Sequence, residues 1–136
     1  RKKTYNSISV PKTVKLNGYT FKVTEIYKNA FKNNTKLKTV KIADNVSKIG
    51  SYAFAGCKNL KSVTIGKGLK SIGSKAFYND KLLKSIVIKS TKVNKVDSKA
   101  FSGIHKNAYI NVPNKKASAY KKIFKNGGQA KTVKIK

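Results

Sequence analysis

The feature that most restricts the fold of this chain is an internal repeat of about 23 residues. An Ala-Phe pair recurs at residues 30–31, 53–54, 76–77 and 100–101, with spacings of 23, 23 and 24 residues. An apolar-x-x-apolar segment precedes every pair, and a Leu-x-x-apolar-x-apolar segment follows the first three. One such unit is too short to bury its own apolar face, so successive units must stack around a continuous core.

The apolar columns of the repeat predict its local structure. The apolar-x-apolar end alternates as a strand does, so equivalent strands are expected to pair in parallel, about 4.8 Å apart. The Ala-Phe pair predicts a helical turn on the opposite wall, and the apolar-x-x-apolar unit predicts a second short strand. Gly50 and Gly73 follow that unit, where a sharp bend needs a permissive backbone. The columns are Val23/Ile26, Val46/Ile49, Leu69/Ile72 and Val93/Val96 before the pair, and Leu37/Val40/Ile42, Leu60/Val63/Ile65, Leu83/Ile86/Ile88 and Ile110/Val112 after it.

The residues before the repeats predict an N-terminal cap, because a solenoid must cover the apolar surface of its first rung. A short alternating segment with Ile8 and Val10 ends at Pro11. Asn17-Gly18 then stands between alternating apolar residues, which favours a hairpin with a type I′ turn. In that hairpin Val14 and Leu16 are expected to pair with Phe21 and its neighbours.

The residues after the repeats predict a second cap, made of a helix and a final strand that contains Val133 and Ile135. Asn114 is the predicted N-cap of the helix and Gly127 its predicted C-terminal stop. A basic amphipathic helix can also lie on a membrane surface, but the apolar face here is small and its position is that of a cap. That face comprises Ala117, Tyr120, Ile123 and Phe124. The whole chain, 1–136, is thus expected to be one domain, with cap hairpin 1–22, four repeats 23–113, and cap helix and strand 114–136.

The charge of the chain has two explanations that the sequence leaves open. The formal net charge is +28, from 32 basic and 4 acidic residues, and all the basic residues except Arg1 are lysine. Lysine-rich composition follows from AT-rich codons, although this does not explain the scarcity of acids. The alternative is a polyanionic partner, which such a charge attracts. The four acids are Glu25, Asp44, Asp80 and Asp97.

Candidate catalytic and metal-binding residues are few. Cys57, the single cysteine, stands beside lysines, a setting that can activate a thiol. Its column in the other repeats holds Asn34, Asp80 and Ile104, and the single histidine, His105, lies two repeats away, so Cys57 is predicted to be structural. One cysteine, one histidine and four scattered acids do not form a catalytic set or a metal site. We therefore predict no enzymatic activity, no metal and no cofactor.

The repeat resembles a known family. The segments VSKIGSYAFAGCKNLKSVTIGKG (46–68) and LKSIGSKAFYNDKLLKSIVIKS (69–90) are similar to the BspA-type leucine-rich repeat of bacterial surface proteins. The resemblance covers residues 23–113, and the outer copies depart from it at Tyr27, Asp97, Ile104 and Asn107. It implies a leucine-rich-repeat solenoid, mostly β, with a parallel sheet on one face. It also implies a structural role for the cysteine position, and adhesion to host, matrix or cell-surface components.

A candidate ligand-binding surface follows from the outward positions of the predicted strands. These positions would line one exposed sheet, and a column of lysines after each repeat leucine would stand beside it. The lysines are either an anion-binding stripe or a solvated rim whose stems cover apolar surface. The candidate residues are Lys38, Thr39, Lys41, Lys61, Ser62, Thr64, Lys84, Ser85, Tyr109 and Asn111.

Three functions remain open at the level of the sequence. The first is a secreted or wall-associated interaction module, monomeric and not inserted in the membrane, that binds a protein or an acidic polysaccharide. The second is nucleic-acid binding, which would be driven by phosphate contacts and blind to sequence because the basic residues are lysines. The third is a structural spacer. Since the chain begins Arg1-Lys2-Lys3 without methionine, we expect a mature or trimmed portion of a longer protein.

Overall fold

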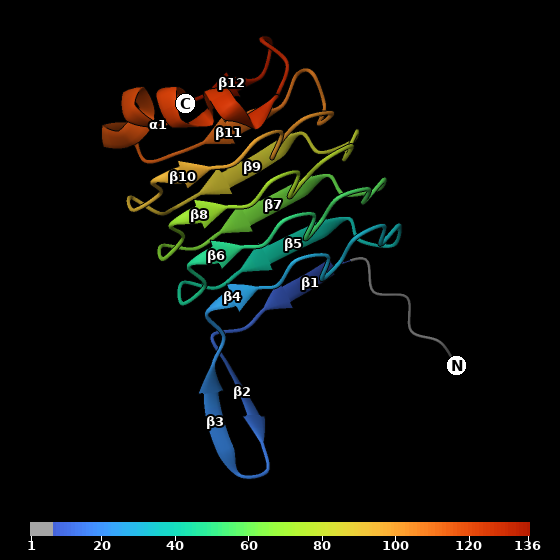
Figure 1. Cartoon of the computed structure of the whole chain (residues 1–136), viewed down its shortest axis with the longest axis vertical. Helices are drawn as coiled ribbons and strands as arrows, with labels where there is room; N and C mark the ends of the chain where they lie inside the picture. The colour runs from blue at the N-terminus through green and yellow to red at the C-terminus, as the bar shows by residue number, and fades with distance from the viewer. Residues whose placement is uncertain (1–6) are drawn as a thin grey trace.

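The computed structural model describes residues 7–136, which form a stack of short coils with a helix at one end (Figure 1). Each coil contributes one strand to a six-stranded parallel sheet, in the order β1-β5-β7-β9-β11-β12. The register keeps equivalent repeat positions opposite one another, so that Val40 faces Val63 and Val63 faces Ile86. The strands are β1 (Ser7–Val10), β5 (Thr39–Ile42), β7 (Ser62–Ile65), β9 (Ser85–Ile88), β11 (Tyr109–Asn111) and β12 (Lys134–Ile135).

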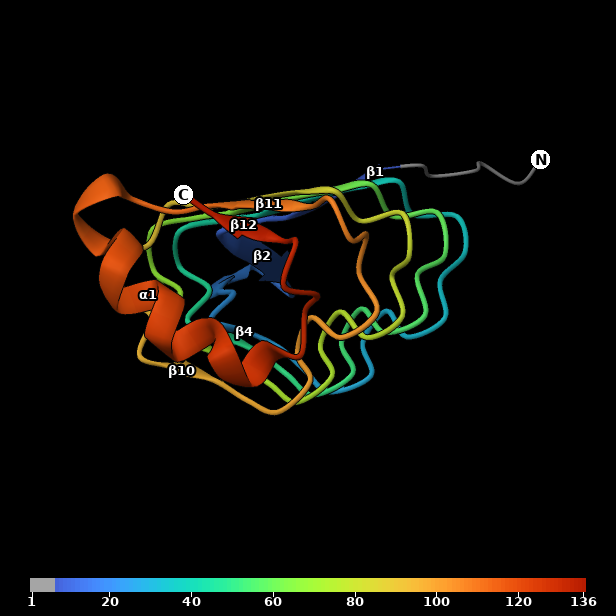
Figure 2. The same cartoon turned by 90° about the horizontal axis from the view of Figure 1, so that it is seen from above.

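The second short strand predicted for each repeat is present and forms a separate four-stranded parallel sheet, in the order β10-β8-β6-β4. Seen along the stack, the six-stranded sheet occupies one side of each coil, and the short strands occupy the opposite side (Figure 2). The apolar column of these strands points into the core between the two sheets. The four strands are β4 (Glu25–Ile26), β6 (Lys48–Ile49), β8 (Ser71–Ile72) and β10 (Lys95–Val96).

The Ala-Phe segments form runs of tight turns, and the prediction of a helical turn there is wrong. Their amides bond alternately within the turn and to the next coil, as when Ala30 N donates to Tyr27 O and Phe31 N donates to Ala53 O. Two residues of each run have positive φ, which interrupts a helix and turns every second amide toward the neighbouring coil. These residues are Asn29, Asn33, Tyr52, Gly56, Lys75, Asn79, Lys99 and Gly103.

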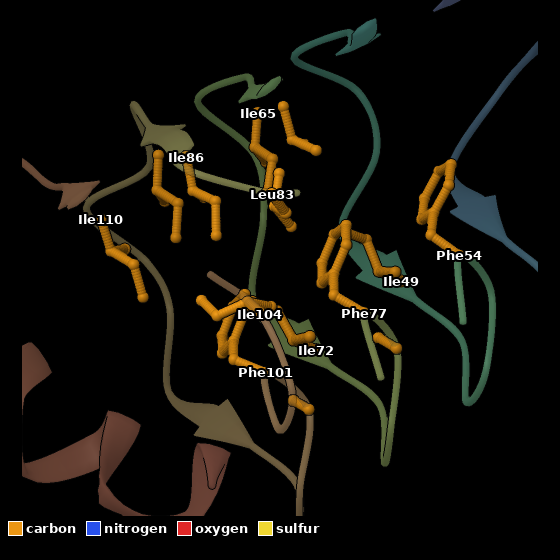
Figure 3. Packing of buried hydrophobic residues seen from close by; sticks show 14 of the residues in the cluster. Ile49, Phe54, Ile65, Ile72, Phe77, Leu83, Ile86, Phe101, Ile104 and Ile110 are labelled. Carbon is orange, nitrogen blue, oxygen red and sulfur yellow. The ribbon is translucent and has the colours of Figure 1, made fainter. Parts of the chain in front are cut away.

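The phenylalanines of the Ala-Phe pairs form a continuous ladder through the core. Phe31, Phe54, Phe77 and Phe101 stack with ring centroids 5.2, 5.4 and 5.4 Å apart and nearly parallel planes, and Figure 3 shows three of these rings in a row. Phe124 of the C-terminal cap continues the ladder, 5.5 Å from Phe101. The middle rings are fully buried, so the ladder joins every coil to its neighbours.

The close approach of neighbouring coils, and not the predicted sharp bend, accounts for glycine at positions 50 and 73. A Cβ on Gly50 would lie 2.5 Å from Lys28 N, and one on Gly73 would lie 2.5 Å from Ser51 N. Neither glycine needs a left-handed backbone. Glycine is therefore required here because the backbone of the preceding coil passes too close for any side chain.

The predicted N-terminal hairpin is confirmed, with β2 (Thr13–Leu16) antiparallel to β3 (Tyr19–Lys22). Asn17 and Gly18 have φ of 51° and 81°, as a type I′ turn requires. The hairpin is an insertion in the first coil: fourteen residues, 11–24, connect β1 to β4, whereas five, 43–47, connect β5 to β6. It extends away from that coil along the axis of the stack (Figure 1), and Phe31 at this end is only half-buried.

The C-terminal cap consists of α1 (Ala117–Ile123), flanked by single 3-10 turns at Asn114–Lys116 and Phe124–Gly127. Its predicted apolar face is confirmed, and the Tyr120 hydroxyl donates to Ser90 O at 2.8 Å and accepts from Val93 N at 3.1 Å. The predicted N-cap is wrong, because Asn114 is itself in the first turn and makes no capping bond. The left-handed residue that ends the helix is Gly128, one position later than predicted.

Candidate functional site

The outward side chains of the six-stranded sheet form two rows, which we call the strand face. The first row runs through Thr39, Ser62, Ser85 and Tyr109, and the hydroxyls of Ser62 and Thr39 lie 3.4 Å apart. The second row contains Lys41, Thr64, Val87 and Asn111. Parallel pairing in register therefore produces a flat surface rich in hydroxyl groups.

Lysines gather along one edge of this face, at the turns that lead into the strands. The backbone bonds from Lys61 N to Lys38 O and from Lys84 N to Lys61 O, 2.9 and 3.1 Å long, hold these turns in register. Strands of one sheet are about 4.8 Å apart, so equivalent lysines stand in adjacent rungs with like charges close together. This set, here called the lysine ridge, comprises the exposed residues Lys36, Lys38, Lys58, Lys61, Lys81, Lys84 and Lys106.

All exposed acids lie away from the lysine ridge. Glu25 lies in β4 and Asp97 directly follows β10, both on the opposite side of the coil. Asp44 follows β5 at the far end of the strands, where Lys67 N donates to its Oδ1 at 2.8 Å and lowers its pKa, assisted by nearby lysines. Asp80, the remaining acid, is fully buried. The positive charge of the ridge is therefore not neutralised by carboxylates of this chain.

The ten residues predicted as a binding surface are all at the surface, and the structure brings them together on the strand face and the lysine ridge. The sequence interpretation missed the ends of the two rows, because β1 and β12 lie outside the four repeats. These strands add Ser7 and Lys134 to the first row and Ser9 to the second, and Lys136 lies 4.7 Å above the ring of Tyr109. The alternation of residues 7–10 and 133–136 was the signal that could have placed them.

A shallow hollow of about 260 Å³ lies where the strand face meets the turns after the strands. Two predicted residues, Lys41 and Thr64, line it together with Ser9, Asp44 and Lys89. Hydroxyl, ammonium and carboxylate groups converge there, which suits hydrogen bonding to a polar ligand lying across the strands.

Cys57 is a structural residue in this fold. Its side chain is fully buried, and Sγ lies 3.3 Å from Phe31 O, to which the thiol donates. Desolvation, and secondarily the carboxyl of Asp80, raises the pKa of Cys57 to about 12. A thiol held in its protonated form is not a nucleophile.

Asp80 occupies the cysteine column in the next coil and carries an unusual carboxyl group. Its Oδ1 accepts a 2.8 Å bond from Cys57 N, while Oδ2 has no partner among the described residues. Burial raises the pKa of Asp80 to about 8. The folded protein therefore holds a proton that the unfolded chain, with its ordinary pKa near 3.8, releases.

We predict that Asp80 makes the fold less stable as the pH rises. The contribution of Asp80 to the free energy of unfolding is fully present below about pH 4 and is lost as the pH rises through about 8. Between these two pH values the carboxyl ionises in the unfolded chain but stays protonated in the folded protein. Asp80→Asn, which matches Asn34 in the same column, should reduce this decline in urea-unfolding midpoints. Asp44→Asn is the control, because the pKa of Asp44 is lowered and its effect has the opposite sign. An unchanged pH profile in Asp80→Asn would contradict the prediction.

No three metal-ligating side chains of residues 7–136 form a cluster that could hold an ion. His105 is half-buried, and its Nδ1 accepts a 3.0 Å bond from Asn107 N within the same turn. None of the helices in this part of the chain has the length and apolar character needed to cross a bilayer.

Several solved structures are similar to this chain, and two of them are leucine-rich-repeat proteins with TM-scores of 0.67 or more. A leucine rich cell surface protein of Faecalibacterium prausnitzii A2-165 is 26% identical, with a TM-score of 0.70, over 98% of this chain and 36% of that protein. A leucine-rich repeat protein of Bacteroides capillosus ATCC 29799 is 25% identical, with a TM-score of 0.67, over 97% of this chain and 78% of that protein. The chain thus spans about a third of the first protein.

The repeat itself identifies the family. No protein with a curated description matches this chain. Residues 24–136 match the BspA type leucine rich repeat region, described with six copies. The match extends beyond the four repeats predicted from the sequence and includes the C-terminal cap and β12. The protein belongs to the BspA-type leucine-rich repeat family.

Proposed function

We propose that this chain is a non-enzymatic interaction module at the cell surface, and that it binds an acidic polymer along the lysine ridge and the adjoining strand face. The observation that carries the proposal is the alignment of seven exposed lysines over four rungs with no exposed carboxylate among them. Exposed lysines such as Lys28, Lys70 and Lys99 also lie on other sides of the coil, but these seven share one edge. Concentrated on one edge, they give the surface the field that attracts and orients a polyanion.

The form of the surface favours a linear ligand. The lysine ridge crosses four rungs of the stack, so a chain of regularly spaced sulfate, phosphate or carboxylate groups can contact several rungs at once. The hydroxyls of the strand face, including Thr39, Ser62 and Ser85, supply hydrogen bonds beside it. Sulfated or sialylated glycans, teichoic acid and acidic proteins all have this chemistry.

The family supports a role in binding at the surface. The similar protein from Faecalibacterium prausnitzii is a leucine rich cell surface protein, and solenoids of this kind use extended surfaces to contact partners. Each lysine contact is weak on its own, because exposed ion pairs contribute only about 0.2–1 kcal/mol. Display of many copies on one cell would convert such contacts into firm attachment.

The experiment that tests this function compares heparin, wall teichoic acid and duplex DNA as ligands of the full chain over a range of salt concentrations. We expect binding to heparin or teichoic acid whose affinity falls steeply with salt, because counterions are released from the polymer. Stronger binding to DNA at physiological salt would contradict the proposal in favour of nucleic-acid binding. Absence of binding to any of the three would favour the structural spacer.

A further inference from the structure

A groove of about 430 Å³ lies over the four-stranded sheet. Figure 2 shows this sheet on the side of the coil opposite the six-stranded sheet. The outward residues of β4, β6, β8 and β10 line the groove, together with the residues that follow these strands. Neither the apolar columns of the repeat nor the lysine ridge explains this groove. Its volume is in the range of sites for small molecules and short oligomers.

Two departures from the repeat lie at the ends of the groove. The column that follows the short strands reads Tyr27, Gly50, Gly73 and Asp97. The glycines leave a floor without side chains, and the two outer residues stand at either end of that floor. Tyr27 and Asp97, which replace the glycine in the outermost copies, therefore mark the two ends of a site that is two coils long.

The charge of the groove differs from that of the rest of the protein. Its charged lining consists of three lysines and two carboxylates, with Lys48 3.6 Å from Glu25 and Lys95 3.6 Å from Asp97. Two of the three exposed acids of this highly basic chain are thus placed here. The near balance of charge removes the attraction for polyanions that the lysine ridge has.

The groove offers hydrogen-bonding groups of both kinds beside an aromatic surface. Ser51 and Ser71 line it from the two middle coils, and both are partly exposed. The carboxylates of Glu25 and Asp97 accept hydrogen bonds. Tyr27 at one end is 68% exposed, and no lysine of residues 7–136 lies over its ring, unlike those of Tyr52, Tyr78 and Tyr109.

We propose that this groove binds an uncharged oligosaccharide. The apolar C–H face of a sugar ring packs on an exposed aromatic ring, as Tyr27 provides, since burial of such a ring is favourable. Sugar hydroxyls both donate and accept, which matches paired carboxylates, ammonium groups and serine hydroxyls. The site is independent of the lysine ridge, so the protein presents a neutral glycan site and a polyanion surface on opposite sides of one solenoid.

The test uses the ¹⁵N-labelled chain, residues 1–136, titrated with maltotriose, cellotriose and triacetylchitotriose at millimolar concentration. We expect at least one of these to shift the amide signals of Tyr27, Gly50 and Gly73, with no loss at high salt, because no net charge is involved. Tyr27→Ala should weaken that binding by about fivefold to tenfold. Tyr109→Ala, on the opposite side, is the matched control and should bind the same sugar with the affinity of the unaltered chain.

A second variant keeps the inference testable if Tyr27→Ala disturbs the first coil. Ser71→Lys adds bulk and charge at the centre of the groove, and lysine is tolerated in that column at Lys48 and Lys95. It should abolish the shifts while leaving heparin binding unchanged. The inference is overturned if none of the three sugars shifts the groove amides, or if binding survives both substitutions undiminished.

Discussion

Phe77→Ala is expected to be among the most destabilising single substitutions in this protein, with a loss of about 3–5 kcal/mol in the free energy of unfolding. Phe77 is fully buried, and its ring stacks on Phe54 and on Phe101, both at 5.4 Å, with planes within 4° and 2° of parallel. The substitution leaves a cavity at the centre of the ladder and removes two aromatic contacts, each of about 0.5–1.5 kcal/mol. Such a loss is a large part of the stability of a typical domain.

Urea unfolding followed by circular dichroism measures this effect, and Phe31→Ala is its matched control. Phe31 occupies the same repeat position but is half-buried, with one ring neighbour, Phe54, at 5.2 Å in the described structure. Phe31→Ala should lower the free energy of unfolding by clearly less than Phe77→Ala, because water already reaches one side of the Phe31 ring. Equal losses in the two variants would show that the ladder does not couple the coils.

Reversing the charge of three ridge lysines, as Lys38→Glu, Lys61→Glu and Lys84→Glu together, is expected to weaken heparin binding by about tenfold to a hundredfold. These lysines occupy one column of adjacent rungs, so the change places three carboxylates in the middle of the lysine ridge. All three side chains are exposed, and the fold should therefore be retained. Affinity measured by calorimetry at moderate salt gives the comparison.

The matched control carries the same change in net charge on the cap helix region, as Lys115→Glu, Lys122→Glu and Lys125→Glu. These lysines are also exposed but lie at the end of the stack, on the turns and helix of the C-terminal cap. The control should lose only the small, long-range part of the attraction, which salt screens. Equal losses in both triple variants would show that the net charge, and not the lysine ridge, determines binding.

The repeat columns allowed most of the fold to be predicted from the sequence. Positions such as Leu60, Val63 and Ile65 alternate or recur with a period that only a stacked coil can bury, and all three are fully or almost fully buried. The hairpin turn at Asn17-Gly18 was predictable for a local reason, because few residue pairs accept two positive φ angles. Local chemistry and periodicity agree in these parts of the chain.

Details that depend on contacts between coils were predicted less well. Gly50 and Gly73 were attributed to a bend, whereas the reason for glycine is the backbone of the preceding coil. The Ala-Phe turns were expected to be helical, but half of their amides bond to the next coil. In both cases the determining partner is a full repeat away in sequence.

The sequence by itself determined the stacked coil, its register and its core, because a 23-residue apolar period leaves no other way to bury those side chains. Only the tertiary structure decided where the charges meet. The turns bring lysines from four repeats to one edge, and the four-stranded sheet brings Glu25 and Asp97 from opposite ends of the repeat region to one groove. Composition records how many charges a chain carries, whereas their distances, which fix what the surface attracts, depend on the fold.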